Sequence, residues 1–388
     1  MSLINRKKFL LTAGMMISVP ILLEKCTTHF PRQLERISNG TGKQKLYFDE
    51  PILNAIFAGV TAPNPHNTQA WKIKKINELE MELYVDETRL VPITDPTLRQ
   101  IHIGQGTFLE TLKIGSSDFG YDTTITLFPE GEYKISEVGK KPVAKVFLKQ
   151  TTKAPDELAI AIQNRRTDRS SYYGEFLSDQ ELNKILKTSG QRFTEQRIFN
   201  RKEEMDPILK QSFEAMKVET LNIRTGDESR VWFRFSDKEI QEKRDGIALP
   251  DQAVTGFSRW MLETFFMSPE PEKFHNKSGL NVFLEGYAKK INSAKGLIYW
   301  KTKSNTLKDW VQTGFDYVRF QLAATKLGYV IHPMSQILQE YPEMDTLRTN
   351  FEKKQTVKNP EKIQMLARIG RSDYNYFTPR RNLRSFLV

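Results

Sequence analysis

The clearest periodic pattern in the chain is a helical one toward its C-terminus. Four apolar residues follow one another at spacings of four, three and four, which places them on one face of an α-helix: Val311, Phe315, Val318 and Leu322. Two small alanines lie near the end of this run, and Gly328 follows as a natural C-terminal cap. Because small residues let another backbone approach, the pattern predicts a deeply buried helix over residues 311–328.

A weak internal repeat relates this helix to a segment 208 residues earlier. Residues 106–121 and 314–329 both begin with glycine and end with Gly-Tyr. The match preserves side-chain size and spacing more than identity. It favours two related halves, each built around a buried central helix. Two unrelated helices that both end in Gly-Tyr are the alternative.

Strand-like alternation of apolar and polar residues surrounds both helices. It predicts strands at residues 80–85, 123–128 and 143–148, and a further strand over 296–300. Ser178 and Glu181 form a capping-box pattern, which predicts a helix running through Leu186. Since helices and strands are mixed within each half, the predicted fold class is α+β.

The N-terminus has the pattern of an export signal. Three basic residues at positions 6–8 precede an uncharged apolar run over 9–23, which is too short to span a bilayer as a helix. The string at residues 6–10 resembles the twin-arginine export motif. We therefore expect residues 1–30 to be an export signal or a short N-terminal anchor, and 31–45 to be a linker. The expected location is the cell envelope or periplasm, with membrane association through the N-terminal segment; lipidation at Cys26 or a short buried helix are alternatives.

Composition and charge narrow the classes of function. The chain has 388 residues and a net charge of +11, but the basic excess lies mostly in residues 1–45 and 366–388. A nucleic-acid binder would carry a basic stripe on its folded part, so no nucleic-acid partner is expected. Cys26 is the single cysteine, which excludes a disulfide within the chain and a metal site made of several thiolates.

Three short polar segments are the candidates for chemistry. Residues 62–71 form a stiff loop with two prolines, and the amide side chains of Asn67 and Gln69 suit a polar heterocycle. Residues 164–171 contain three arginines and several hydroxyls, which suit a phosphate group. Arg380 and Arg381, directly after a proline, also suit an anion. The structural alternatives are a tight turn, a solvated run of charges and a basic tail.

Taken in this order, the three segments resemble the nitroreductase superfamily of flavoproteins, and most of all its Acg-like branch, in which two halves are fused. The branch motif is close to Ala-Pro-Ser-x-His-Asn-Thr-Gln-Pro-Trp; this chain has Asn64 in place of the serine and Ala70 in place of the last proline. The resemblance covers about residues 50–388. It implies a nitroreductase-like fold of two fused halves, each with a mixed or antiparallel sheet. The halves would span 46–150 and 155–388, with a lid insertion around 200–295.

The resemblance also implies an FMN cofactor. The Arg-x-Thr-x-Arg string and the C-terminal arginine pair would hold its phosphate, while the proline- and asparagine-rich loop and the loop after the central helix would contact the flavin. The implied cofactor-binding residues are Pro63, Asn64, His66, Asn67, Gln69, Arg165, Arg166, Thr167, Arg169, Pro333, Met334, Ser335, Arg380 and Arg381. We further expect His332 to be a neighbour of the flavin pocket, and no metal ligands.

The implied function is FMN-dependent transfer of hydride or electrons through flavin N5, from a small-molecule donor to a small nitroaromatic or quinone-like acceptor. The flavin carries the chemistry, so no catalytic side chain is needed. Each half holds only one part of the binding pattern, which predicts one complete FMN site per chain and a monomer built as a pseudo-dimer. A flavin-sequestering envelope protein without turnover, and an exported interaction module that has lost FMN, are the alternatives.

Overall fold

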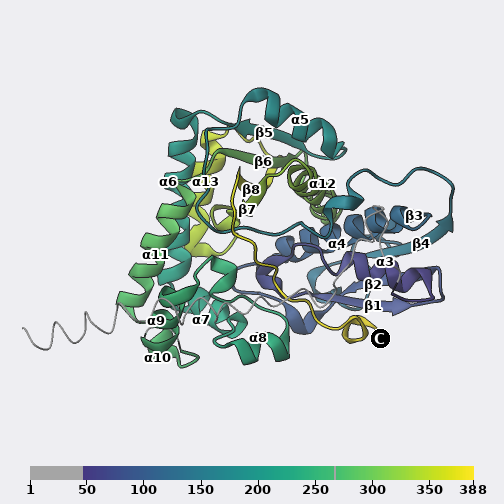
Figure 1. The fold of residues 1–388 in the computed structure, drawn as a ribbon, viewed down its shortest axis with the longest axis horizontal. Coiled ribbons are helices and arrows are strands. Elements are labelled where there is room, and N and C mark those ends of the chain that lie inside the picture. The colour runs from purple at the N-terminus through teal and green to yellow at the C-terminus, as the bar shows by residue number, and fades with distance from the viewer. Residues whose placement is uncertain (1–46, 266–267) are drawn as a thin grey trace, which may run out of the picture.

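The computed structural model describes residues 47–265 and 268–388, and it confirms the predicted α+β class with two fused halves (Figure 1). The predicted leader, the linker and Cys26 lie outside the described residues. Among the helices of the described ranges, none combines the length and the hydropathy that crossing a membrane needs.

Each half contains one four-stranded antiparallel sheet, and the two sheets have the same topology. The strand orders are β1-β2-β4-β3 and β5-β6-β8-β7. The first half consists of α3 (Pro51–Gly59), β1 (Trp71–Lys75), β2 (Glu80–Val85), α4 (Arg99–Asp118), β3 (Tyr121–Leu127) and β4 (Ala144–Gln150). The second consists of α5 (Asp179–Ser189), β5 (Glu195–Phe199), β6 (Gly296–Thr302), α12 (Leu307–Lys326), β7 (Val330–Pro333), α13 (Asp345–Lys354) and β8 (Lys362–Gly370).

The halves differ in how their first two strands are joined. Residues 76–79 connect β1 to β2, whereas residues 200–295 connect β5 to β6; we call residues 200–295 the helical segment. It contains α6 (Lys202–Leu221), α7 (Ile223–Trp232), α8 (Asp237–Lys243), α9 (Gly256–Phe265), α10 (Pro271–Phe274) and α11 (Lys277–Ile291). Figure 1 shows α6 and α11 along one side of the second sheet and α7 to α10 below it.

The two central helices α4 and α12 cross at the glycines that open the internal repeat. A Cβ on Gly106 would lie 1.9 Å from the carbonyl oxygen of Val311, and a Cβ on Gly314 would lie 2.2 Å from that of Ile103. Only glycine permits this approach of two backbones. The repeat therefore marks the contact between the two halves.

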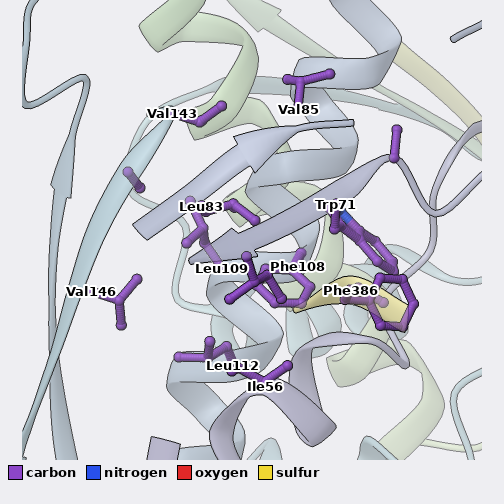
Figure 2. Close-up of a cluster of buried hydrophobic side chains, with 14 of the residues drawn as sticks. Ile56, Trp71, Leu83, Val85, Phe108, Leu109, Leu112, Val143, Val146 and Phe386 are labelled. Carbon is purple, nitrogen blue, oxygen red and sulfur yellow. The ribbon is translucent and has the colours of Figure 1, made fainter. Parts of the chain in front are cut away.

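The C-terminal segment runs back from the second half to the first. After β8 the chain passes the first half and ends beside β1, where the backbone N–H of Val388 donates to the carbonyl oxygen of Ile73 (Figure 1). Phe386 packs its ring 6.0 Å from that of Trp71 in the first core, which Figure 2 shows together with Phe108. The first core is thus completed by residues from the end of the chain.

Candidate functional site

A cavity of about 440 Å³ lies where the two halves and the helical segment meet. This volume is within the range of small-molecule and cofactor sites, roughly 300–1,000 Å³. α4 contributes Ile103 and Gly104 to the wall, and α12 contributes Tyr317. The cavity includes seven of the fourteen predicted site residues: Pro63, Asn64, His66, Thr167, Arg169, Pro333 and Ser335.

The loop before β1 is held in shape by its own side chains. The Asn64 side chain accepts a hydrogen bond from the backbone N–H of Gln69 at 2.8 Å and donates to the carbonyl oxygen of Ala62. His66, Asn67 and Gln69 all have positive φ, which non-glycine residues rarely adopt. Such strain persists where the surroundings fix the backbone, and it places Pro63, Asn64 and His66 at the cavity wall.

The structure places Asn67 and Gln69 away from the cavity lining, unlike the sequence-based expectation. Asn67 donates from Nδ2 to the carbonyl oxygen of Pro379, and its Oδ1 accepts from Arg380 at 2.9 Å. Gln69 donates to the carbonyl oxygen of Arg244 and accepts from the backbone N–H of Arg381, both at 2.9 Å. These amides fasten the C-terminal segment to the loop, so their hydrogen-bonding groups are already engaged.

Arg165 and Arg380 also lie behind the cavity wall. Arg165 donates to the carbonyl oxygen of Thr61 at 2.7 Å, and Arg380 donates to those of Val60 and Ala62 at 2.9 and 3.0 Å. Burial lowers the pKa of Arg165 to about 10, and burial together with the Arg165 charge lowers that of Arg380 to about 9. Both stay protonated at neutral pH and bind backbone of the first half.

The remaining three predicted residues have structural partners as well. Arg166 donates to the carbonyl oxygens of Tyr374 and Ser372. Met334 is fully buried in the hydrophobic cluster between the second sheet and the helical segment. Arg381 lies over the ring of Phe386, with 4.3 Å from its guanidinium carbon to the ring centroid. None of the three is part of the cavity lining.

One part of the cavity, which we call the cationic end, is lined by Arg169, Lys290 and His332, and the buried Arg368 lies directly behind His332. Arg169 donates to the carbonyl oxygen of Asp251 at 3.3 Å, and Lys290 donates to that of Gln252 at 2.5 Å. Among the residues that the structure describes, no carboxylate lies within ion-pair distance of Arg169, Lys290 or Arg368. Arg169 and Lys290 are half-buried, and the carboxylates of Asp251 and Asp168 act on Arg169 and Arg368 without pairing with them, so this end is suited to an anionic ligand.

His332 of the cationic end and His66 of the loop before β1 are neutral. Arg368 donates from Nε to Nδ1 of His332 at 3.0 Å, which leaves the proton of that imidazole on Nε2. Burial and the charges of Arg368, Arg169 and Lys290 lower the pKa of His332 well below its usual value. Burial and Arg169 lower the pKa of His66 to about 4. Each imidazole can therefore offer one N–H to a ligand.

Lys290 is a site residue that sequence reasoning missed. It lies on α11, in the helical segment, where no motif of the chain indicated a contact. Burial, with the neighbouring Arg368 and Arg169, lowers its pKa to about 8. Glu219 and Tyr287 of the same segment also line the cavity and were likewise not predicted. Their only sequence signal is helical periodicity, which does not distinguish a cavity wall from an ordinary core.

In the described part of the chain, no group of three His, Cys, Asp or Glu residues is arranged to hold a metal ion.

Comparison with known proteins gives partial matches. No protein-family model matches the chain. The uncharacterized protein Rv3127 of Mycobacterium tuberculosis is 32% identical over 123 residues, which is 30% of this chain and 34% of the relative. The putative NAD(P)H nitroreductase Rv3131 of the same organism is 26% identical over 125 residues, 32% of this chain and 34% of that relative. The chain thus matches about a third of the length of these curated relatives.

Solved structures give a similar result. The FMN-dependent nitroreductase NfnB from Mycobacterium smegmatis in complex with NADPH covers 58% of this chain and 94% of its own, with a TM-score of 0.38 and 13% identity. A putative nitroreductase from Desulfovibrio desulfuricans in complex with FMN covers 60% and 95%, with a TM-score of 0.34 and 14% identity. The Acg-like branch stays a prediction. Over about a third of its length the chain resembles a putative nitroreductase in sequence.

Proposed function

We propose that the chain is an FMN-dependent oxidoreductase of the nitroreductase type, with FMN in the cavity between the halves. The observation that carries the proposal is the cationic end, where Arg169 and Lys290 line a cavity without a carboxylate partner among the described residues. A flavin phosphate carries close to two negative charges at neutral pH. The donors present fit such a group.

The residues of the chain would hold the cofactor in a defined way. Arg169 and Lys290 would bind the phosphate through charge-assisted hydrogen bonds, and the Thr167 hydroxyl would donate a further one. Pro63, Asn64, Pro333 and Ser335 line the rest of the cavity and would bound the flavin. When bound, FMN supplies transfer of hydride or electrons through N5. The helical segment adds apolar side chains to the wall of the cavity.

The proposal is tested by titrating the purified protein with FMN and, separately, with riboflavin. Riboflavin lacks the phosphate, so we expect FMN to bind at least about ten-fold more tightly, as charged hydrogen bonds contribute roughly 1.5–3 kcal/mol each. Arg169→Ala should reduce the preference for FMN, while Arg201→Ala, an exposed cation on the surface, should keep it. Equal affinities for the two flavins would contradict the role of the cationic end.

Turnover separates an oxidoreductase from a flavin-sequestering protein. The loaded protein would be mixed anaerobically with NADH or NADPH and then with an uncharged nitroaromatic or quinone acceptor, and the flavin absorption would be followed. An oxidoreductase bleaches with the donor and recovers with the acceptor. A flavin that binds but stays oxidised with both donors and dithionite, or never recovers, would favour sequestration.

A further inference from the structure

A second polar part of the cavity surrounds Glu219, near the end of α6. Its side chain is buried, with 8% of the residue exposed, and it lines the cavity together with Met216 and Thr220 of the same helix. The Gln339 side chain forms a hydrogen bond with the carboxyl group. Among the described residues, no hydrogen-bond partner is found for Glu219 Oε2.

Two further buried groups in this place also lack a partner in the described part of the chain. They are the Tyr287 hydroxyl on α11 and the Gln339 carbonyl oxygen Oε1, and both residues line the cavity. Buried polar groups in native proteins are almost always hydrogen-bonded. Of the unsatisfied groups that line the cavity, these three lie near one another and indicate a ligand with polar atoms of its own.

Apolar side chains, half of them aromatic, line the same cavity. They are contributed by the helical segment: Phe233, Ile247, Leu249, Phe274, Leu280 and Phe283. A charged ligand would lose its hydration here without a counter-charge. The walls thus favour an uncharged, flat ligand whose polar atoms reach Glu219.

The charged groups of the neighbouring elements leave Glu219 without a cation. Glu228 of α7 is the charged neighbour that acts on its pKa, and its carboxylate accepts from the backbone N–H groups of Ile93 and Thr94. On α11, burial raises the pKa of Tyr287, and the charge of Glu219 raises it further. Burial raises the pKa of Glu219 to about 7; the hydrogen bond from Gln339 opposes this rise, and the charge of Glu228 adds to it.

The other titratable groups packed against α6 are engaged elsewhere. Arg348 of α13 pairs with Asp345 at 2.6 Å and lies 3.7 Å from Glu352. Glu343 accepts from Asn222 at 2.8 Å, and the pKa of Tyr341 is raised by burial, so Tyr341 stays neutral. A neutral carboxyl with no cation beside it can act as a hydrogen-bond donor.

We propose that Glu219, in its neutral form, donates a hydrogen bond to a carbonyl or nitro oxygen of an uncharged aromatic acceptor bound against the helical segment. The inference rests on the proposed function, since it identifies this part of the cavity as the acceptor subsite. It makes Glu219 a specificity-determining residue. Above about pH 7, where Glu219 ionises, its carboxylate repels an acceptor that carries a negative charge on the ring.

The test measures binding of 1,4-naphthoquinone to the FMN-loaded protein by calorimetry, without reductant, from pH 6 to pH 8.5. In the wild type the affinity falls as the pH rises through about 7, by roughly ten-fold, the value of one hydrogen bond to a charged or strongly polar group. Glu219→Gln keeps a donor that does not titrate, so its affinity stays near the low-pH value. Glu219→Leu lacks the donor, so at every pH its affinity is roughly ten-fold below the low-pH affinity of the wild type.

Matched controls isolate the contribution of Glu219. Glu204→Gln, an exposed glutamate on the same helix, should show the wild-type profile. Lys290 titrates near pH 8 in the same cavity, and its effect should be the same in wild type and Glu219→Gln. The anionic 1,4-naphthoquinone-2-sulfonate should bind more weakly than the neutral quinone above pH 7. A wild-type profile that is flat, or that Glu219→Gln reproduces, overturns the inference.

A second readout does not depend on any ligand. Because the folded-state pKa of Glu219 lies above its unfolded value, the unfolded chain ionises first as the pH rises. The carboxyl therefore destabilises the fold increasingly between about pH 5 and pH 8. The urea midpoint of Glu219→Gln should exceed that of the wild type by a margin that grows over this range; a constant margin contradicts a neutral Glu219.

Failure of the inference and of the proposed function are distinguishable. Glu219→Gln should bind FMN as the wild type does, because the cationic end is unchanged. If the wild type does not bind FMN at all, the proposed function fails, while the stability readout still reports on Glu219. If FMN binds normally and the quinone profile is flat, only the inference fails.

Discussion

At Lys290, burial disfavours the protonated, charged form of the side chain. The side chain lies on the cavity wall, next to Arg169 and Arg368, and its pKa is lowered to about 8. A phosphate in contact with it would favour the protonated form and raise that pKa again. Binding of an anion and protonation of Lys290 are thus linked, so affinity for the anion must depend on pH.

The linkage predicts that FMN affinity of the wild type declines between pH 7 and pH 9, by about ten-fold, because deprotonation of Lys290 removes a charged hydrogen bond. The phosphate stays a dianion over this range. Lys290→Met should bind more weakly at pH 7 and lose the decline. Lys289→Met, at the exposed neighbouring position, is the matched control. A decline of equal size in Lys290→Met would show that another group causes it.

Among the residues predicted from local motifs, some line the cavity, and others are held away from it by distant partners. Pro63, Asn64 and Arg169 line the cavity as expected. Asn67 does not, because its amide bonds with Pro379 and Arg380, more than 300 positions away in the chain. No local pattern reveals such a partner. The binding role of the residues that do line the cavity stays a prediction.

At the scale of elements, the crossing of α4 and α12 fixes how the two halves meet. Gly106 and Gly314 lie at this crossing, where the backbones are too close for any side chain. Arg99, at the start of α4, adds a polar connection by donating to the carbonyl oxygen of Gln364 in β8 at 2.9 Å. The cavity walls from α4 and α12 therefore depend on two glycines.

We predict that Gly106→Ala lowers the free energy of unfolding by roughly 2–4 kcal/mol, because a methyl group at this crossing forces the helices apart. Gly286→Ala on α11 is the control. No atom lies within 4 Å of a Cβ at that position, and alanine favours the helix by up to about 1 kcal/mol. Denaturation in urea measures both variants; equal stabilities would mean that the helices can separate without cost.

Element boundaries were predictable where the local pattern is complete. The strand expected at residues 80–85 is β2, with the same bounds, and the capping box at Ser178 opens α5. The expected helix at 311–328 begins earlier, at Leu307, because Thr306 and Asp309 form a capping box that the apolar spacing does not show. Asn222, Ser236 and Asn276 cap α7, α8 and α11 of the helical segment in the same way, but a cap marks only where a helix begins, and the arrangement of these helices depends on tertiary packing.

In the whole molecule, the two halves have the same sheet topology, but the position that lines the cavity in the first half is filled by side chains in the second. The repeat places Phe315 where the first half has Thr107, a cavity residue. The ring of Phe193 packs 5.9 Å from that of Phe315, and Asp316 accepts from the backbone N–H groups of Phe193 and Thr194. Side chains thus fill the position that the repeat relates to the cavity. This supports one flavin site in each chain.

The stoichiometry of FMN tests this account most directly. Purified protein of known concentration would be titrated with FMN to saturation, and the bound flavin counted per chain by absorbance, with Arg169→Ala titrated in parallel. We expect one FMN per chain for the wild type, whatever the oligomeric state, and a weaker isotherm with the same endpoint for Arg169→Ala. Two FMN per chain, or an unchanged isotherm in Arg169→Ala, would contradict a single site built around the cationic end.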